Sequence, residues 1–265
     1  MRIAPIASGS SGNCIYVGDD NTHILIDVGI SAKNIEEGLN SLDLTINDID
    51  ALLITHEHSD HIKGLGVLER KKEIPIYATQ GTIEGILSVK SLGAFNKDCF
   101  KSLKDLASFT INDFKFNPHP VSHDANEPVC FSFENNHKRA AVVTDLGCYD
   151  DELLKALGKL DFIFAEANHD VRMLQLGPYS YPLKRRILSD KGHLSNEASG
   201  RFISGLLNDD IKSIMIGHLS DKNNLPDLAY EAVKVEITMS DTKYDGLDFP
   251  IYVAKRNEMS KIIYC

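Results

Sequence analysis

The chain has 265 residues, of which 43% are apolar, and its formal net charge is −10. A chain of this length and composition can bury a sizeable core, and α/β layered folds of this size often form one domain. We therefore predict a single domain over residues 1–265. The acidic balance disfavours a general nucleic-acid-binding surface, which usually carries a basic face, although it does not decide the charge of a local cleft.

Two further features of the composition bear on where the protein acts. No stretch approaches the eighteen or more apolar residues of a membrane span, and residues 1–6 lack the long apolar region of a secretory signal. The five cysteines form no CxxC pair, and an odd, scattered set favours reduced thiols over a disulfide framework. We therefore predict a cytoplasmic protein without membrane association, and no feature indicates an obligate protein partner.

Apolar periodicity and turn residues predict strands that alternate with helices. In the first half we expect strands at 1–8, 14–18 and 23–28, a helix at 31–39, a strand at 51–55, a helix at 64–70, a strand at 74–78 and a helix at 82–92. In the second half we expect strands at 109–116, 129–134 and 140–144, a helix at 150–157, a strand at 162–166, a helix at 195–207 and a strand at 213–216. Two similar halves of this kind predict two packed sheets with helices outside.

The segment directly after the strand at 51–55 is the most informative part of the sequence. Residues 55–61 read Thr-His-Glu-His-Ser-Asp-His, which places three imidazoles and two carboxylates where a buried strand ends and the chain turns. Imidazole nitrogens and carboxylate oxygens suit zinc, manganese or iron without any thiolate. The alternative is a solvated histidine-rich loop. The density of donors instead favours a metal site, and one ion cannot use all of them, so two ions are expected.

The pattern His-x-His-x-Asp-His resembles that of the metallo-β-lactamase-fold hydrolases, and the resemblance spans nearly the whole chain. It implies an α/β fold of the four-layer αββα sandwich type and two divalent ions, zinc or manganese, with iron as a third candidate. Three later segments each end a strand pattern with a matching side chain. The implied ligands are His56, His58 and His123 for one ion, Asp60, His61 and His218 for the other, and Asp145 as the bridge between them.

Asp27 follows the apolar run Ile24-Leu25-Ile26 at the end of the third predicted strand. A carboxylate that leaves a buried strand can hydrogen-bond a ligand imidazole and select its tautomer. A loop aspartate that caps a turn would look the same in the sequence. Both interpretations of Asp27 therefore stay open.

Glu166 ends the strand at 162–166, and His193 lies just ahead of a helix that Ser195 can N-cap. Helix N-termini bind phosphate, so Ser195 and Asn196 are candidate substrate-binding residues. In the phosphodiesterase branches of the superfamily, which this arrangement resembles, a Glu holds a His that protonates the leaving oxygen. The resemblance thus implies His193 and Glu166 as catalytic residues, together with the metal ligand Asp60.

The run Lys184-Arg185-Arg186 lies just upstream of His193. These side chains can hold the flanking phosphates of a nucleic-acid substrate. The alternative for each of them is an exposed charged helix face.

Several motifs narrow the branch of the superfamily. Ser8-Gly9-Ser10-Ser11-Gly12-Asn13-Cys14, Glu166-Ala167-Asn168-His169-Asp170 and Gly192-His193-Leu194-Ser195-Asn196 resemble the bacterial YycJ/WalJ group. Residues 145–218 are too few for the large inserted domain of the β-CASP nucleases. The resemblance implies a phosphodiesterase, with 5′→3′ DNA exonuclease activity and DNA as substrate.

Three alternatives to a DNA exonuclease remain open from the sequence. The first is a phosphodiesterase that acts on small molecules. The second is a thioester hydrolase of the glyoxalase-II type, although the strand-like tail at 249–264 has no obvious counterpart to the usual C-terminal helical extension. The third is a catalytically silent binding protein, which the complete set of matching ligands disfavours.

Overall fold

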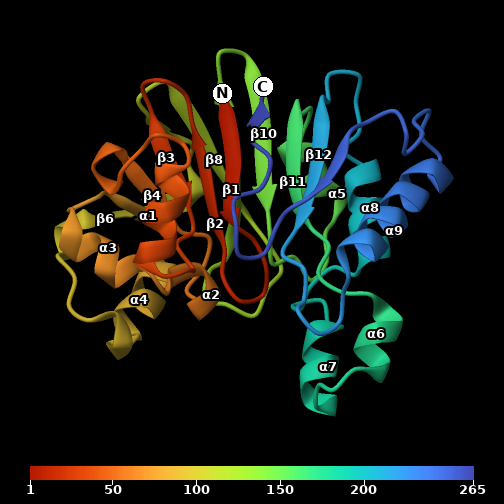
Figure 1. Ribbon diagram of the computed structural model, residues 1–265, viewed down its shortest axis with the longest axis horizontal. Helices are drawn as coiled ribbons and strands as arrows, with labels where there is room; N and C mark the ends of the chain where they lie inside the picture. The colour runs from red at the N-terminus through yellow and green to blue at the C-terminus, as the bar shows by residue number, and fades with distance from the viewer. The chain divides into compact units, whose positions relative to one another are not determined.

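The computed structural model describes residues 1–265 (Figure 1). The strands are β1 (Arg2–Ala7), β2 (Cys14–Gly18), β3 (His23–Ile26), β4 (Ala51–Leu53), β5 (Ile76–Ala78), β6 (Phe100–Ser102), β7 (Phe109–Ile111), β8 (Phe114–Pro120), β9 (Val129–Asn135), β10 (Lys138–Val143), β11 (Phe162–Glu166), β12 (Ser213–Gly217), β13 (Ile251–Val253) and β14 (Ile263–Tyr264). The α-helices are α1 (Ala32–Asn40), α2 (Ser59–Ile62), α3 (Leu65–Lys71), α4 (Gln80–Ser88), α5 (Asp151–Leu157), α6 (Val171–Leu176), α7 (Tyr181–Ile187), α8 (Asn196–Ser204) and α9 (Pro226–Met239). Short 3-10 helices lie at Ile46–Asp48, Lys90–Leu92, Lys97–Cys99 and Lys104–Leu106.

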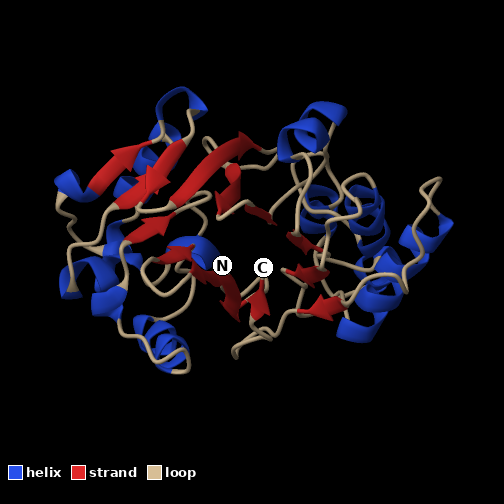
Figure 2. Cartoon of the chain, turned by 90° about the horizontal axis from the view of Figure 1, so that it is seen from above, coloured by secondary structure: helices blue, strands red, loops and turns tan.

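The strands belong to two mixed sheets of seven, with orders β14-β1-β2-β3-β4-β5-β6 and β13-β12-β11-β10-β9-β8-β7. The chain packs as two compact units. Unit 1 comprises residues 1–120, 125–129 and 255–264, and unit 2 comprises residues 121–124, 130–254 and 265. In both units, helices pack alongside strands (Figure 2).

Unit 1 contains a sheet in which antiparallel and parallel strands meet at β3. Strands β1, β2 and β3 pair antiparallel, whereas β3, β4, β5 and β6 pair parallel. Ile26 of β3 lies in register with Leu53 of β4, so the two strands end at the same edge of the sheet. The segments that follow these strands, which begin at Asp27 and Ile54, therefore start close together. Carboxyl ends of neighbouring parallel strands are a common place for a site in an α/β fold.

Unit 2 repeats this arrangement with β10, β11 and β12, which are parallel neighbours. Val143 lies in register with Ala165, and Glu166 with Gly217, so residues 144–146, Glu166 and His218 emerge at one edge of the sheet. Every residue of β11 and β12 is buried, and most are apolar. This is the usual composition of parallel strands that are covered on both faces. Helices α5, α8 and α9 flank these strands (Figure 1).

Local sequence signals account for several element boundaries. The side chains of Ser31, Asp150 and Ser195 accept hydrogen bonds from backbone N–H groups in the first turns of α1, α5 and α8, which satisfies donors that a helix start leaves unpaired. Asn136 and His137 have φ values of 49° and 63° and turn the chain between β9 and β10. Positive φ at both central residues is what a type I′ hairpin turn requires.

The structure corrects some of the predicted elements. The single strand predicted at 109–116 is two strands, β7 and β8, because Asn112 adopts a left-handed φ of 49° and the chain reverses there. The helix predicted at 82–92 ends at Ser88, since Val89 is extended and a 3-10 turn follows. Helices α2, α6, α7 and α9 were not predicted. None of the helices is long and apolar enough to cross a membrane.

Candidate metal centre

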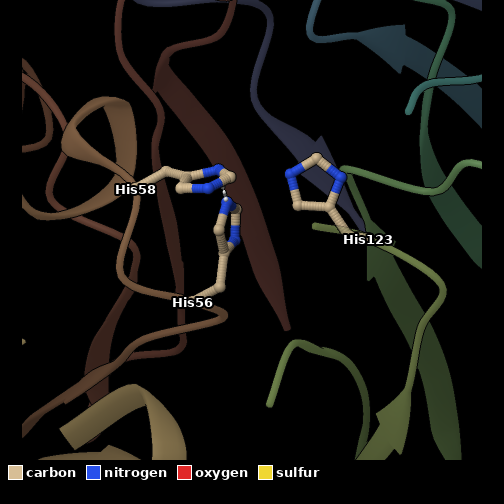
Figure 3. Close-up of side chains that lie close together, drawn as sticks. All are labelled: His56, His58 and His123. Carbon is tan, nitrogen blue, oxygen red and sulfur yellow. Dashed lines mark hydrogen bonds between the residues drawn. The ribbon is translucent and has the colours of Figure 1, made fainter. Parts of the chain in front are cut away.

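Unit 1 holds the histidines of the Thr55–His61 segment in a buried cluster. His56 and His61 are almost wholly buried, with ring centroids 4.1 Å apart, whereas His58 is half-buried. The Nε2 atom of His56 lies 3.0 Å from Nδ1 of His58, and Figure 3 shows these two rings converging. Asp60 lies in the first turn of the short helix α2, and its Oδ2 atom lies 3.5 Å from Nε2 of His61. The predicted ligands of this segment are therefore gathered within one unit.

Asp27 selects the tautomer of His61. Its Oδ2 atom lies 2.7 Å from Nδ1 of His61, and its Oδ1 atom accepts the backbone N–H of Thr55 at 2.9 Å. Because an ionised carboxylate only accepts, Nδ1 carries the proton and Nε2 keeps its lone pair. Metal-ligating histidines usually donate their second ring nitrogen in this way. Asp27 thus contacts both a ring nitrogen of His61 and the backbone of Thr55.

Thr55 extends the same arrangement to His56, and sequence reasoning missed it. The hydroxyl of Thr55 lies 2.9 Å from Oδ2 of Asp27 and 3.0 Å from Nδ1 of His56. If the hydroxyl donates to the carboxylate, it accepts from Nδ1 of His56, which leaves Nε2 of His56 unprotonated. One carboxylate thus orients two imidazoles. A threonine directly before the first histidine was the available signal.

The loop that carries Asp60 and His61 is held by unit 1's first turn. Asn13 donates its backbone N–H to the carbonyl of Asp60 at 2.8 Å, and its Nδ2 atom lies 3.2 Å from Nε2 of His61. Gly29 packs so closely that a Cβ atom there would lie 1.6 Å from the carbonyl oxygen of Asp60. Only glycine fits at this approach of two backbones. The loop at residues 8–14, which contains Asn13, therefore supports the histidine cluster.

In unit 2, Asp145 is the point on which three imidazoles converge. Its Oδ1 atom lies 3.4 Å from Nε2 of His218, 3.7 Å from Nε2 of His123 and 3.5 Å from Nδ1 of His193. Nδ1 of His123 faces the carbonyl of Gly192 at 3.1 Å, so this ring donates there and presents Nε2 to the aspartate. All these side chains are buried except His193, whose side chain is 15% exposed.

Glu166 connects this cluster to its surroundings through both carboxylate oxygens. Oε1 accepts the backbone N–H groups of Leu146 at 2.8 Å and Leu194 at 2.9 Å. Oε2 accepts the N–H of Asp145 at 3.2 Å and lies 3.1 Å from Nδ1 of His193. Several donors compensate for burying a carboxylate that is 0% exposed. Glu166 therefore holds both Asp145 and His193 in place.

Three of the clustered residues adopt left-handed backbone conformations. Asp27, Asp145 and His218 have φ values of 58°, 57° and 53°, and each follows a strand by one or two residues. Such conformations are uncommon outside glycine and gather at functional sites, where the surrounding structure maintains them.

The donor set fits a metal ion. The ligand atoms of Asp145, Glu166, His193 and His218 lie within 4.8 Å of one another in unit 2, and the His56–His58 nitrogens converge in unit 1. Neutral imidazole nitrogens with carboxylate partners on the opposite ring nitrogen are the arrangement that zinc and related ions use. Clusters of histidine and aspartate suited to metal binding are therefore present in both units.

The predicted substrate-binding residues occupy different environments. Ser195 caps α8 and donates its hydroxyl to Glu197 at 2.9 Å. Asn196 is 0% exposed, and its amide donates to Asn224, so its side chain supports the loop and does not face solvent. The basic run forms the last turn of α7. There Lys184 donates to the carbonyl of Gln175 at 2.8 Å, and Arg186 forms a two-point pair with Asp124.

His169 is a buried histidine that the sequence did not single out. It is 1% exposed, neither ring nitrogen has a hydrogen-bond partner, and burial lowers the pKa of its imidazole to about 4. An unfolded histidine titrates near its ordinary pKa of about 6.5, so the unfolded chain binds a proton first as pH falls. The stability contributed by the neutral ring is fully present above pH 6.5 and is lost as pH falls towards 4.

We therefore expect His169→Phe to flatten the acid destabilisation of the protein. Urea unfolding at pH 7.5 and pH 5.0 should show the parent losing about 2 kcal/mol more unfolding free energy than the variant, because the other titrating groups are shared. Phenylalanine keeps a ring in the space and forfeits no hydrogen bond. An equal loss in both proteins would show that His169 is not buried in its neutral form.

Comparison with known proteins identifies the family. Residues 22–209 match the beta-lactamase superfamily domain. The chain is 40% identical to Exodeoxyribonuclease YycJ of Bacillus anthracis over 88% of each chain, and 38% identical to Exodeoxyribonuclease WalJ of Streptococcus pneumoniae over 95% of this chain and 93% of that one. The metallo-β-lactamase fold protein YhfI of Bacillus subtilis superposes with a TM-score of 0.71 at 15% identity, covering 98% of both chains.

These matches confirm the predicted fold class, since the likeness to YhfI covers nearly the whole of both chains. They also agree with the position of the histidine and aspartate clusters at the carboxyl ends of parallel strands. The chain belongs to the metallo-β-lactamase superfamily, in the group that contains YycJ and WalJ.

Proposed function

We propose that this protein is a metal-dependent DNA exonuclease that hydrolyses phosphodiester bonds from the 5′ end. Two relatives that match most of the chain are named exodeoxyribonucleases. The observation that carries the proposal is the contact between His193 and Glu166 beside Asp145. This pair supplies an oriented proton donor next to the proposed metal ligands, which phosphodiester hydrolysis needs when the leaving group is a poor one.

We infer that the histidine and aspartate donors of this chain hold two divalent ions, zinc or manganese, with iron as a third candidate. The proposed ligands are His56, His58 and His123 for one ion, Asp60, His61 and His218 for the other, and Asp145 between them. When bound, such ions lower the pKa of water and stabilise negative charge on phosphoryl oxygens. We also propose that residues 1–265 act as a single domain, and the scattered cysteines favour the cytoplasm as its location.

The protein's own residues supply the remaining parts of the mechanism. Glu166 accepts from Nδ1 of His193 and stabilises the protonated ring, so Nε2 of His193 can donate a proton to the departing oxygen. Asp27 and Thr55 keep the nitrogens of His61 and His56 in the state that binds a metal. Contacts of this kind hold the reacting groups in fixed positions, which is how a preorganised site lowers a barrier.

We propose that the basic run Lys184-Arg185-Arg186 contacts phosphates outside the reacting centre. Its three side chains differ in whether they already have a partner within the protein. Arg186 and Lys184 already have partners, whereas Arg185 lies over the ring of Tyr181 and forms no salt bridge. Arg185 is therefore the member most available to a phosphate. Because the whole chain has a formal net charge of −10, the surface that contacts DNA must be local and short.

The experiment compares three substrates with the purified metal-loaded protein: a 5′-labelled DNA oligonucleotide, bis(p-nitrophenyl) phosphate and S-lactoylglutathione. We expect stepwise shortening of DNA from the 5′ end, turnover of the chromogenic diester and no thioester hydrolysis. Activity on the chromogenic diester without DNA shortening would favour a small-molecule phosphodiesterase, and thioester turnover would favour the glyoxalase-II type.

Replacing Lys184, Arg185 and Arg186 together by alanine should raise KM for the oligonucleotide and leave the small diester nearly unchanged. Each lost phosphate contact should also reduce the salt slope by about 0.7 for a single strand. A matched control removes Lys101, Lys104 and Lys115, which lie in unit 1 around β6 to β8. If the first triple variant cleaves DNA as well as the parent does, the run is only a solvated helix face.

A further inference from the structure

Helices α6 and α7 form an arm that starts and ends at the proposed catalytic pair. The arm comprises residues 170–191, so the chain enters it shortly after Glu166 and leaves it shortly before His193. In Figure 1 both helices extend past the ends of the strands of unit 2. Both ends of the arm are thus connected, within unit 2, to the segments that carry Glu166 and His193.

The base of the arm is fixed to that centre by several contacts. Arg186 pairs with Asp124, and the hydroxyl of Ser122 donates to the carbonyl of Asp190 at 2.7 Å. The N–H of His193 donates to the carbonyl of Ile187 at 3.0 Å, so the end of α7 is bonded directly to the proposed catalytic residue. These contacts hold α7 in one orientation relative to His193.

The charge of the arm is opposite to that of the protein. It contains five basic residues and two acidic ones, whereas the whole chain has a formal net charge of −10. Two of the five, Lys184 and Arg186, are engaged within unit 2. The excess positive charge complements a polyanion, such as the phosphate backbone of DNA.

The arm also exposes an aromatic ring beside a guanidinium group. Tyr181 is 72% exposed in the first turn of α7, and the Cζ atom of Arg185, one turn later, lies 6.0 Å from the centre of its ring. Pro182 follows Tyr181 and restricts the backbone of that turn. Leu176, at the end of α6, is 89% exposed. An aromatic face with a cation next to it is the arrangement that binds unpaired bases and the phosphates between them.

We propose that Tyr181 and Arg185 form a single-strand-binding surface on the arm, where one unpaired base stacks on the Tyr181 ring and Arg185 binds a neighbouring phosphate. This inference rests on the proposed nuclease function and adds the strand state of the substrate. In a duplex the base faces are covered by their neighbours, so an external ring cannot stack on them, whereas a single strand offers them freely. The surface thus selects single-stranded DNA ends.

The test measures equilibrium binding and not only turnover. The metal-loaded parent and variants are titrated into a fluorescently labelled single-stranded oligonucleotide with phosphorothioate linkages, and the anisotropy is recorded. Tyr181→Ala should raise the Kd by roughly 5- to 150-fold, the range for loss of one stacked base. Tyr181→Phe keeps the aromatic face and should restore the Kd to within about 2-fold of the parent. Arg185→Ala should lower the salt slope by about 0.7.

Tyr264→Ala is the matched control, because Tyr264 is 69% exposed and lies on β14 in unit 1. It should leave the Kd unchanged, and Tyr181→Ala should leave turnover of bis(p-nitrophenyl) phosphate and the melting temperature unchanged. A parent-like Kd for Tyr181→Ala, or an equal loss on duplex and single strand, overturns the proposed surface. A parent that turns over the chromogenic diester but neither binds nor shortens DNA would instead overturn the proposed function.

Discussion

His193→Ala is expected to slow hydrolysis of diesters with poor leaving groups, such as DNA, by roughly 10²–10⁴, the range for loss of a general acid. The reason is the position of His193: Nδ1 is held by Glu166 at 3.1 Å, and the side chain is partly exposed beside the buried cluster around Asp145. A nitrophenolate can depart unprotonated, so bis(p-nitrophenyl) phosphate should lose much less activity. The measurement is the ratio of kcat/KM values for the two substrates, variant against parent.

The companion variant Glu166→Gln tests how Glu166 orients His193, whereas His193→Ala removes the proton donor itself. Glutamine keeps the length of the side chain but replaces one acceptor oxygen by an NH₂ group. Either the N–H groups of Leu146 and Leu194, or the N–H of Asp145 together with Nδ1 of His193, then lose their acceptor. We expect an activity loss together with a lower melting temperature, whereas His193→Ala should lower activity alone. Equal losses on both substrates for His193→Ala would assign His193 to substrate binding instead of proton donation.

Asp145→Asn is expected to abolish turnover and to lower the metal content of the protein measured by elemental analysis. Asn tolerates the left-handed φ of 57° at this position, and its size matches that of Asp, so the fold should persist. The amide removes the negative charge on which His123, His193 and His218 converge. His56→Ala should have the same two effects through the other cluster, since it deletes the nitrogen that faces His58.

His137→Asn provides the control for this pair. His137 lies in the turn between β9 and β10 with a φ of 63°, which asparagine also adopts readily, and it contributes to none of the histidine and aspartate clusters. Metal content and turnover should match those of the parent. Full metal content with unchanged activity in Asp145→Asn would remove the two-ion assignment, whatever the result for His193.

The local parts of this protein could be predicted from its sequence because they depend on neighbours in the chain. Ser31, Asp150 and Ser195 cap helices through contacts three residues along, and apolar runs of four to six residues marked the central strands. The same locality placed His56, Asp145 and His218 at strand ends, where the structure has them. Their roles as metal ligands stay predictions, which the variants above test.

The hydrogen bonds that organise the site depend on tertiary structure. Thr55 meets Asp27 across 28 residues, His61 meets Asp27 across 34, and Asn13 meets His61 across 48. A sequence pattern with a period of two or 3.6 residues carries no information about such pairs, because strand register decides them. The contact between Asp27 and His61 depends on β3 and β4 lying side by side in the sheet.

The sequence by itself determined which chemistry is available: histidine and aspartate donors at the ends of buried strands, and a Glu–His pair downstream of them. Only the tertiary structure decided which ring nitrogen each histidine presents, that Asn196 is buried, and that Arg186 is paired while Tyr181 and Arg185 face solvent. The reason is physical. Side-chain type sets what a group can bind, but burial and the partner on the opposite atom decide whether it is free to bind.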